Sequence, residues 1–366
     1  MANRRMIAIA AVLIMMLSVV PLGIILSDSD TEADTDGRVQ VTYNAGNASA
    51  DETSYNYGVS KNSYTFTYYG TAVAEYNPQF WSEYTVGETS NEEKVSDWLG
   101  IRQYTQQTIV FTGWECNGKI IDPGEDLTSE FGDSDSLTLT ATWGTVQSVK
   151  RVSGQFGGNK DLGIFNPAQS DTWGNDNTSS KYTNIVLLNG NISFYQGSAG
   201  AFDFQIKNCT IRSDGGPYSI SLYIPSNWPA GEKSLSLDGN VIIDNVKLIG
   251  RESDGNSHGS DEVSSLYTKG NQLIIGTGVS CGETSAGQGV QIFGGRQDDD
   301  SSKSDIRIFS GKYSNIIGGS NNGGVGTTHV TLLGGQVTDT IYGGSLRGDV
   351  GESHVLVVGG CVRSGD

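Results

Sequence analysis

The sequence predicts a mainly β protein that begins with an N-terminal hydrophobic helix, continues with a small β module and ends in a parallel β-helix (solenoid) of roughly 24–25 residues per coil. Three observations carry this prediction. Glycine supplies 50 of 366 residues but proline only 7, a balance typical of tight turns between short strands. The 16 Tyr and 6 Trp exclude a disordered chain. Two phrases recur with one period in the C-terminal half, which indicates a repeat architecture.

Residues 1–26 form a predicted signal peptide or transmembrane anchor. Arg4 and Arg5 precede an apolar run over residues 6–26, and an acidic linker follows over residues 27–36. The run is close in length to the roughly 20 residues that a helix needs to cross a bilayer. Positive charge before it and acidic residues after it place the remainder of the chain outside the cell. A buried core helix is the third interpretation. We therefore expect an extracellular, cell-surface protein, either secreted or anchored in the membrane through residues 6–26.

Residues 37–144 form the predicted β module. Its first strand, RVQVTYNAG, alternates Val39, Val41 and Tyr43 with polar residues, as a strand with one buried face does. Turns are expected at Asn117-Gly118 and at Pro123-Gly124. The VTYNAG opening, the FTGW strand and the closing LTATWG with Trp143 resemble the internalin-type B-repeat of bacterial and archaeal surface proteins. That resemblance implies a small β-grasp-like module, with an insertion over residues 50–105, that acts as a spacer or interaction unit without catalysis.

Residues 145–366 contain the repeat. The phrases VQIFGG, NIIGGS and TIYGGS place their first paired glycines at Gly294, Gly318 and Gly343, a period of roughly 24–25 residues. A second phrase, DIRIFSG, HVTLLGG and HVLVVGG, runs in step with the first. Short strands at such a period predict stacked coils in which equivalent residues lie one strand spacing, about 4.8 Å, apart. Each coil would need its neighbours to cover its apolar face.

The register predicts two apolar ladders, one through Ile306, Val330 and Val355 and one through Ile308, Leu332 and Val357. The paired glycines are expected at corners, where there is no room for a side chain and φ is often positive. QLIIGTG (272–278) is expected to be an earlier copy, and three less regular segments upstream are expected to be degenerate coils. The last phrase carries no polar cap, so we expect the chain to continue in the natural protein; the alternative is an end-to-end partner that covers this face.

The charge balance, 23 basic and 41 acidic residues with a net charge of −18, argues against a nucleic-acid partner because such a surface repels phosphates. The regular coils also present no pair of carboxylates of the kind that glycoside hydrolysis requires. Their outward column of Arg307, Thr331 and Leu356 contains no carboxylate, and Asp339 lies near Asn315 without an acidic partner. The run Asp298-Asp299-Asp300 is a solvated loop or a calcium ligand set. We expect no enzyme activity and no cofactor.

One column of the repeat consists of side chains that could bind a metal ion. Asp305, His329 and His354 occupy the same position in three successive coils. If the register holds, two imidazoles and a carboxylate would stand about one strand spacing apart, where they could hold a zinc-type ion or change charge near pH 6. The alternative is a polar position in a drifting repeat. The remaining histidine, His258, lies in a Gly/Ser/Asp loop and is expected to be solvated.

The cysteines and sequons define possible covalent chemistry. The cysteines are far apart in the chain, at Cys116, Cys209, Cys281 and Cys361, and this wide separation excludes a zinc ribbon. Their pairing cannot be read from spacing, and buried free thiols are expected. Possible N-glycosylation sites, for a host that glycosylates exported proteins, are Asn47, Asn177, Asn191 and Asn208.

Export, the B-repeat-like module and a glycine-rich solenoid together look like the adhesin-like surface proteins of bacteria and archaea. The resemblance implies a binding or structural protein whose partner is an extracellular glycan or protein on a host, in the matrix or on neighbouring cells. Multivalent weak contacts along a rigid rod would supply the avidity. Two alternatives remain at this point: a β-helix polysaccharide lyase or glycoside hydrolase, and a surface-layer component without a ligand.

Overall fold

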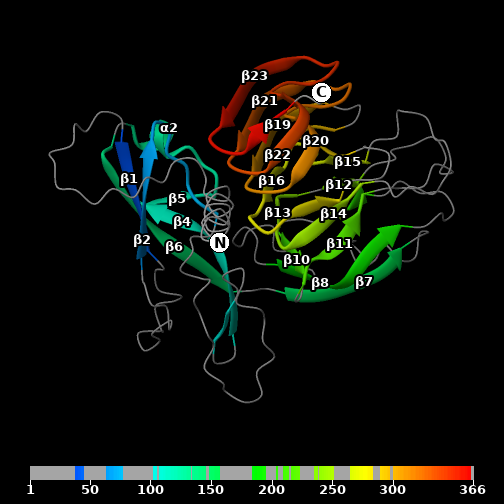
Figure 1. Ribbon diagram of the computed structural model, residues 1–366, viewed down its shortest axis with the longest axis horizontal. Helices are drawn as coiled ribbons and strands as arrows, with labels where there is room; N and C mark the ends of the chain where they lie inside the picture. Colours follow the sequence, from blue (N-terminus) through cyan, green and yellow to red (C-terminus); the bar gives the residue numbers. More distant parts are fainter. Residues whose placement is uncertain are drawn as a thin grey trace, which may run out of the picture.

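The computed structural model describes the chain over fifteen segments. These are residues 38–44, 63–76, 102–104, 107–132, 134–145, 148–156, 184–194, 203–204, 209–213, 216–222, 235–237, 239–250, 264–282, 289–296 and 300–363. The predicted signal or anchor (1–26) and the acidic linker (27–36) lie outside them. Within the described part, no helix is both long and apolar enough to cross a membrane. The described chain is mainly β, with large parallel sheets (Figure 1).

The first sheet is mixed and has six strands in the order β2-β1-β6-β4-β3, with β5 paired to β4. The strands are β1 (Arg38–Asn44), β2 (Ser63–Tyr69), β3 (Arg102–Tyr104), β4 (Gln107–Cys116), β5 (Lys119–Ile121) and β6 (Ser136–Thr145). A short helix, α2 (Leu127–Phe131), follows β5; Asp126 caps it by accepting a hydrogen bond from Ser129 N. The first and last strands, β1 and β6, run parallel, whereas β4 is antiparallel to β6.

The core of this sheet follows the alternation in the sequence. Val41 and Tyr43 of β1 are fully buried and Val39 nearly so, as the RVQVTYNAG pattern predicts. Trp114 is also fully buried, with its ring 4.9 Å from that of Tyr43 in an edge-on arrangement. Both predicted turns are confirmed: Asn117-Gly118 joins β4 to β5 with positive φ at both residues, and Pro123-Gly124 follows β5.

The rest of the described chain passes repeatedly between two parallel sheets. Eleven strands form one sheet and seven form another, and all neighbours within them are parallel. The first set is β7 (Ser148–Phe156), β8 (Asn184–Phe194), β10 (Cys209–Ser213), β11 (Tyr218–Ser221), β13 (Val241–Ile243), β14 (Val246–Ile249), β16 (Gln272–Ile275), β17 (Ser280–Gly282), β19 (Ser301–Ile308), β21 (Val325–Leu332) and β23 (Val350–Val357). The second set is β9 (Asp203–Phe204), β12 (Leu235–Leu237), β15 (Ser264–Tyr267), β18 (Val290–Phe293), β20 (Lys312–Ile317), β22 (Gln336–Tyr342) and β24 (Cys361–Val362).

We call one passage of the chain through both sheets a coil. Earlier coils contain three strands, such as β16, β17 and β18, whereas the last three contain two, such as β21 and β22. Each strand lies on its equivalent in the next coil, an arrangement compatible with a β-solenoid. The segment QLIIGTG is the predicted earlier copy, since Leu273 lies opposite Ile306 despite the longer intervening loop.

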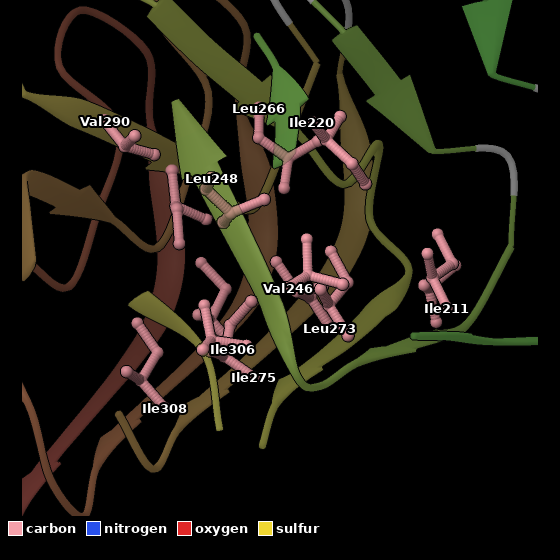
Figure 2. Packing of buried hydrophobic residues seen from close by; sticks show 14 of the residues in the cluster. Ile211, Ile220, Val246, Leu248, Leu266, Leu273, Ile275, Val290, Ile306 and Ile308 are labelled. Carbon is pink, nitrogen blue, oxygen red and sulfur yellow. The ribbon is translucent and has the colours of Figure 1, made fainter. Parts of the chain in front are cut away.

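The predicted apolar ladders are present and form the core between the two sheets (Figure 2). Ile306 lies opposite Val330, which lies opposite Val355, and the ladder through Ile308 is built in the same way. Ile306 is 0% exposed and Val330 1%, but Val355 is 47% exposed. The difference arises because β23 is at the edge of its sheet, so a neighbouring coil covers its inward residues on one side only.

Close packing of stacked backbones requires glycine in both phrases, since a Cβ on Gly335 would be 2.6 Å from the backbone oxygen of Gly311, and the second phrase adds a conformational cause. In the second phrase, Gly335 has φ +85°, a left-handed conformation that favours glycine, as the sequence predicts. In the first phrase, Gly318 has no positive φ, and its glycine is required by close packing. A Cβ on Gly318 would run into the backbone oxygen of Gly343 one coil further on. Stacked backbones, rather than strained turns, therefore exclude side chains there.

The mixed sheet and the parallel stack lie side by side (Figure 1) and contact each other. The contact on the mixed sheet comes from the turn after β5 and from Tyr76, and on the stack from the outward side of β16 and β19. The contact covers residues of the stack that face away from its core, and the candidate site lies beside it.

Candidate functional site

The predicted column of Asp305, His329 and His354 exists, and it is longer than predicted. Asp305 lies opposite His329, which lies opposite His354. The column extends to earlier coils through Gln272, which lies opposite Asp305. Gln272 N in turn donates to the side-chain oxygen of Asn240, 2.9 Å away, at the start of β13. A row of polar side chains therefore crosses the stack from β23 to β13; we call it the polar column.

The two imidazoles at the end of the polar column are stacked. The ring centroids of His329 and His354 are 4.6 Å apart and the ring planes differ by 4°. Both residues are exposed. Glu352, two residues before His354 and on the same face of β23, places its carboxylate oxygen 3.0 Å from His354 Nε2. Partial burial lowers the pKa of His329, and the nearby Asp305 carboxylate opposes this shift without reversing it.

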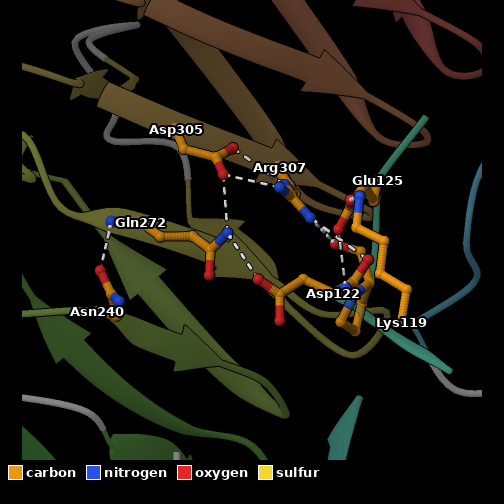
Figure 3. A network of polar contacts seen from close by, with 8 residues as sticks. Lys119, Asp122, Glu125, Asn240, Gln272, Asp305 and Arg307 are labelled. Atoms are coloured by element: carbon orange, nitrogen blue, oxygen red, sulfur yellow. Dashed lines mark hydrogen bonds and ion pairs between the residues drawn. The ribbon is translucent and has the colours of Figure 1, made fainter. Parts of the chain in front are cut away.

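Asp305 is held by its neighbours within the fold. Arg307 Nε and Nη2 donate to its two carboxylate oxygens at 2.9 and 2.8 Å, a bidentate pair. Gln272 Nε2 donates to the same carboxylate at 2.7 Å (Figure 3). In the described part of the chain, no group of three or more His, Cys, Asp or Glu side chains is already gathered to hold a metal ion. The polar column thus presents two histidines beside a carboxylate, that of Asp305, which already accepts hydrogen bonds from Arg307 and Gln272.

Arg307 connects the parallel stack to the mixed sheet. Its Nη1 donates to the backbone oxygen of Pro123 at 2.8 Å, in the turn that follows β5 (Figure 3). Gly124 of that turn lies against the methylene groups of Arg307, where a Cβ would be 2.8 Å from Cδ. The Arg307 side chain is consequently only 12% exposed. Burial alone would lower the pKa of Arg307, but Asp305, Asp122 and Glu125 outweigh it and raise the pKa, so the guanidinium stays charged.

The prediction for the Arg307 column therefore needs a correction. Arg307, Thr331 and Leu356 do lie in register and face away from the core. Arg307, however, does not lie on an open outer face, because the turn after β5 covers it. Pro123 and Arg307 are far apart in the chain and belong to different architectures, so repeat spacing carries no information about their contact. The predicted turn at Pro123-Gly124 was the one available signal.

A second contact between the mixed sheet and the stack lies at Asp244. This residue follows β13 and is fully buried. Its Oδ1 accepts hydrogen bonds from the backbone N–H groups of Asn245 and Gly278 at 2.8 and 2.7 Å. Burial raises its pKa to about 6, although these N–H groups, the charge of Arg212 and a hydrogen bond from Tyr76 act in the opposite direction. Tyr76 also packs on Phe309, with ring centroids 5.7 Å apart.

The other predicted sites have mixed outcomes. Asn191 is exposed in β8 and its side-chain oxygen accepts from Ser219 N, whereas Asn47, Asn177 and Asn208 lie outside the described residues. So do His258, Asp298 and Asp299, while Asp300 accepts a hydrogen bond from Gly324 N. Asp339 is displaced from Asn315 by a bulge, which places Thr340 opposite Asn315.

All four cysteines are free thiols. Cys116 and Cys209 are buried as predicted, whereas Cys281 and Cys361 are half-buried. Burial raises the pKa of the thiols of Cys116, Cys209 and Cys281, which lowers the thiolate fraction and hence their reactivity.

In comparisons with known proteins, no family model, curated protein or solved structure matches this chain.

Proposed function

We propose that this chain is an adhesin-like cell-surface protein that displays a rigid parallel β-helix for contact with glycans, matrix proteins or neighbouring cells. In this proposal the chain is exported, residues 6–26 are a signal peptide or membrane anchor, and the mixed sheet is a β-grasp-like module of the B-repeat type. Glycosylation at Asn191 would be compatible with its exposure. The protein acts by binding and not by catalysis.

The observation that supports this proposal most directly is the unbroken register of four strands of the stack. Strands β16, β19, β21 and β23 pair residue for residue, so equivalent outward side chains repeat at one strand spacing, about 4.8 Å. On the last three coils two rows of outward positions are Lys303, Thr327 and Glu352, and Asp305, His329 and His354, whereas the row of Arg307, Thr331 and Leu356 is covered at Arg307 by the turn after β5. Repeating rows of side chains suit a repeating polymeric ligand, for which many weak contacts add up.

The contact between the mixed sheet and the stack also supports a display role. Arg307 is bound to Asp305 within the stack and to Pro123 of the mixed sheet. Tyr76 packs on Phe309 in a second contact. A module held at two points presents the stack in a defined direction, whereas a flexible linker would let it reorient freely. The net charge of −18 favours neutral or basic partners over nucleic acids and other polyanions.

The proposal is tested with beads that carry the purified protein at low and high density, incubated with polysaccharides, matrix proteins and cells. We expect retention of one such partner, with retention rising more steeply than protein density because binding is multivalent. The disruptive variant is Gly318→Val. Its side chain meets the backbone of the next coil, so the stacked surface should be disturbed and retention abolished. Retention that is unchanged in G318V, or no retained partner, would refute the proposal. Cleavage of a polysaccharide would show an enzyme instead.

A further inference from the structure

The loop between β22 and β23 carries a charged tripeptide, Arg347-Gly348-Asp349. The arginine and the aspartate are exposed, and the glycine between them is half-buried. Because Cα atoms two residues apart are separated by at most about 7 Å, the loop presents a positive and a negative side chain close together. Leu346, which is 43% exposed, adds an apolar side chain directly before them.

The preceding coil fixes the backbone of this loop. Leu346 N donates a hydrogen bond to that coil at 3.0 Å, and Asp349 O accepts one from Val325 N at 2.8 Å. Between these two points, Gly348 packs so closely that a Cβ would run into the backbone oxygen of Gly323. The charged side chains therefore project from a backbone that is already ordered, and a partner that binds them does not have to order it.

Both charges are available to a partner. Arg347 Nη1 donates to Asn322 Oδ1 at 3.4 Å, which is long for a hydrogen bond. Among the described residues, neither Arg347 nor Asp349 takes part in an ion pair. Asp300 also directly precedes a strand of this stack, but its carboxylate accepts a hydrogen bond from Gly324 N at 2.6 Å. The Asp349 side chain has no such contact within the described chain.

We propose that Arg347 and Asp349 together bind a protein receptor, on a cell or in the matrix, in one pocket that offers each of them an opposite charge. This inference rests on the adhesin-like function proposed above and names the partner class. A receptor carboxylate accepts two hydrogen bonds from the guanidinium. A positive centre of the receptor, either a divalent cation or a basic side chain, binds the Asp349 carboxylate.

The pair of opposite charges favours a protein over a glycan. An anionic polysaccharide would attract Arg347 but repel Asp349, and a neutral one would leave both charges without a partner of opposite sign. A protein pocket can place an acidic group and a positive centre a few ångströms apart, and that arrangement excludes ligands that carry only one of the two charges.

The experiment measures retention of suspended fibroblasts by beads that carry the full chain at graded density. We expect Arg347→Ala and Asp349→Asn each to raise the density needed for half-maximal retention at least tenfold. Arg363→Ala and Asp339→Asn are matched controls, because they remove one charge each from exposed residues of the same stack, and they should bind as the wild type does. Removal of surface proteins from the cells with trypsin should abolish retention.

Peptide competition provides a readout that does not depend on the folding of any variant. A synthetic peptide of residues 345–350 should inhibit retention of the wild type, and the same peptide with its arginine and aspartate exchanged should not. Loss of retention in EDTA would identify the positive centre of the receptor as a divalent cation, and retention in EDTA would identify it as a basic side chain.

The outcomes separate this inference from the proposed function. Retention that is equal in wild type, R347A and D349N, that survives trypsin treatment, or that neither peptide inhibits would overturn the receptor assignment and leave the adhesin-like function in place. A wild type that retains no cells also overturns the assignment. The adhesin-like function itself falls only if polysaccharides and matrix proteins are not retained either.

Discussion

Replacing Arg307 with alanine is expected to destabilise the protein by about 3 kcal/mol. Arg307 donates two charge-assisted hydrogen bonds to Asp305 and one to the backbone oxygen of Pro123. Removing one partner of a buried ion pair costs about 3–5 kcal/mol. We expect the lower end of that range, since the Asp305 side chain is 22% exposed and keeps its hydrogen bond from Gln272. R307K keeps the charge but not the bidentate geometry, and it should lose about half as much.

The assay is equilibrium unfolding in urea, followed by circular dichroism, for the wild type, R307A, R307K, D305A and the double variant R307A/D305A. The double-mutant cycle should yield a coupling of about 1–3 kcal/mol between Arg307 and Asp305. Arg347 is an exposed arginine on the same stack, so R347A is the matched control and should change stability by less than about 0.5 kcal/mol.

A loss of less than about 1 kcal/mol in R307A, the value of an exposed ion pair, would show that the turn after β5 does not exclude water from the guanidinium, and it would refute the prediction. An R307K variant as stable as the wild type would refute it equally, because the bidentate geometry would then contribute nothing.

Three further predictions concern the stack. Because burial raises the pKa of Asp244 from 3.8 to about 6, the folded state binds its proton more tightly than the unfolded state; stability from this group is full below pH 3.8 and falls by about 3 kcal/mol as pH rises through 6. D244N should lack that component in unfolding curves measured from pH 4 to pH 7, and identical pH profiles would contradict the prediction. Leu332→Ala should cost about 2–5 kcal/mol because Leu332 is fully buried, whereas Val357→Ala, one coil further in the same ladder and half exposed, should cost less than about 1 kcal/mol; equal losses in thermal unfolding would show that Val357 is covered in solution. Gly318→Ala should destabilise by more than about 1 kcal/mol, since its Cβ meets the backbone of Gly343, while Gly216→Ala, which has open space, should be neutral in the same thermal assay.

Much of the stack was predictable because the interactions that build it repeat. A coil contacts the next coil through residues one period apart, so spacing alone predicts that Ile306, Val330 and Val355 lie opposite one another. The same spacing predicts the polar column through His329 and His354. Residues that are in register over several coils reinforce one another, and a drift of one residue would expose a whole ladder to water.

The groups that surround the candidate site were less predictable. Glu352 is two residues from His354, a spacing that places both on one face of a strand, so that contact was available from the sequence in principle. The contact of Arg307 with Pro123 was not, because it joins surfaces of different architecture that share no period. The first glycine phrase was predicted to be a corner, but the reason for it, the approach of the Gly343 backbone to Gly318, depends on the stacked coordinates.

The sequence by itself determined the period at which strands stack, which side chains point inward, and where β1 and its neighbouring turns lie. These properties follow from local alternation and from contacts between equivalent residues of neighbouring coils. Only the tertiary structure decided that the turn after β5 packs on Arg307, that the Asp305 carboxylate is bound by Arg307 and Gln272, and that the final valines are half exposed. Those properties arise where non-equivalent surfaces meet or where a strand is covered from one side only, and shape complementarity of that kind has no repeat in the sequence to reveal it.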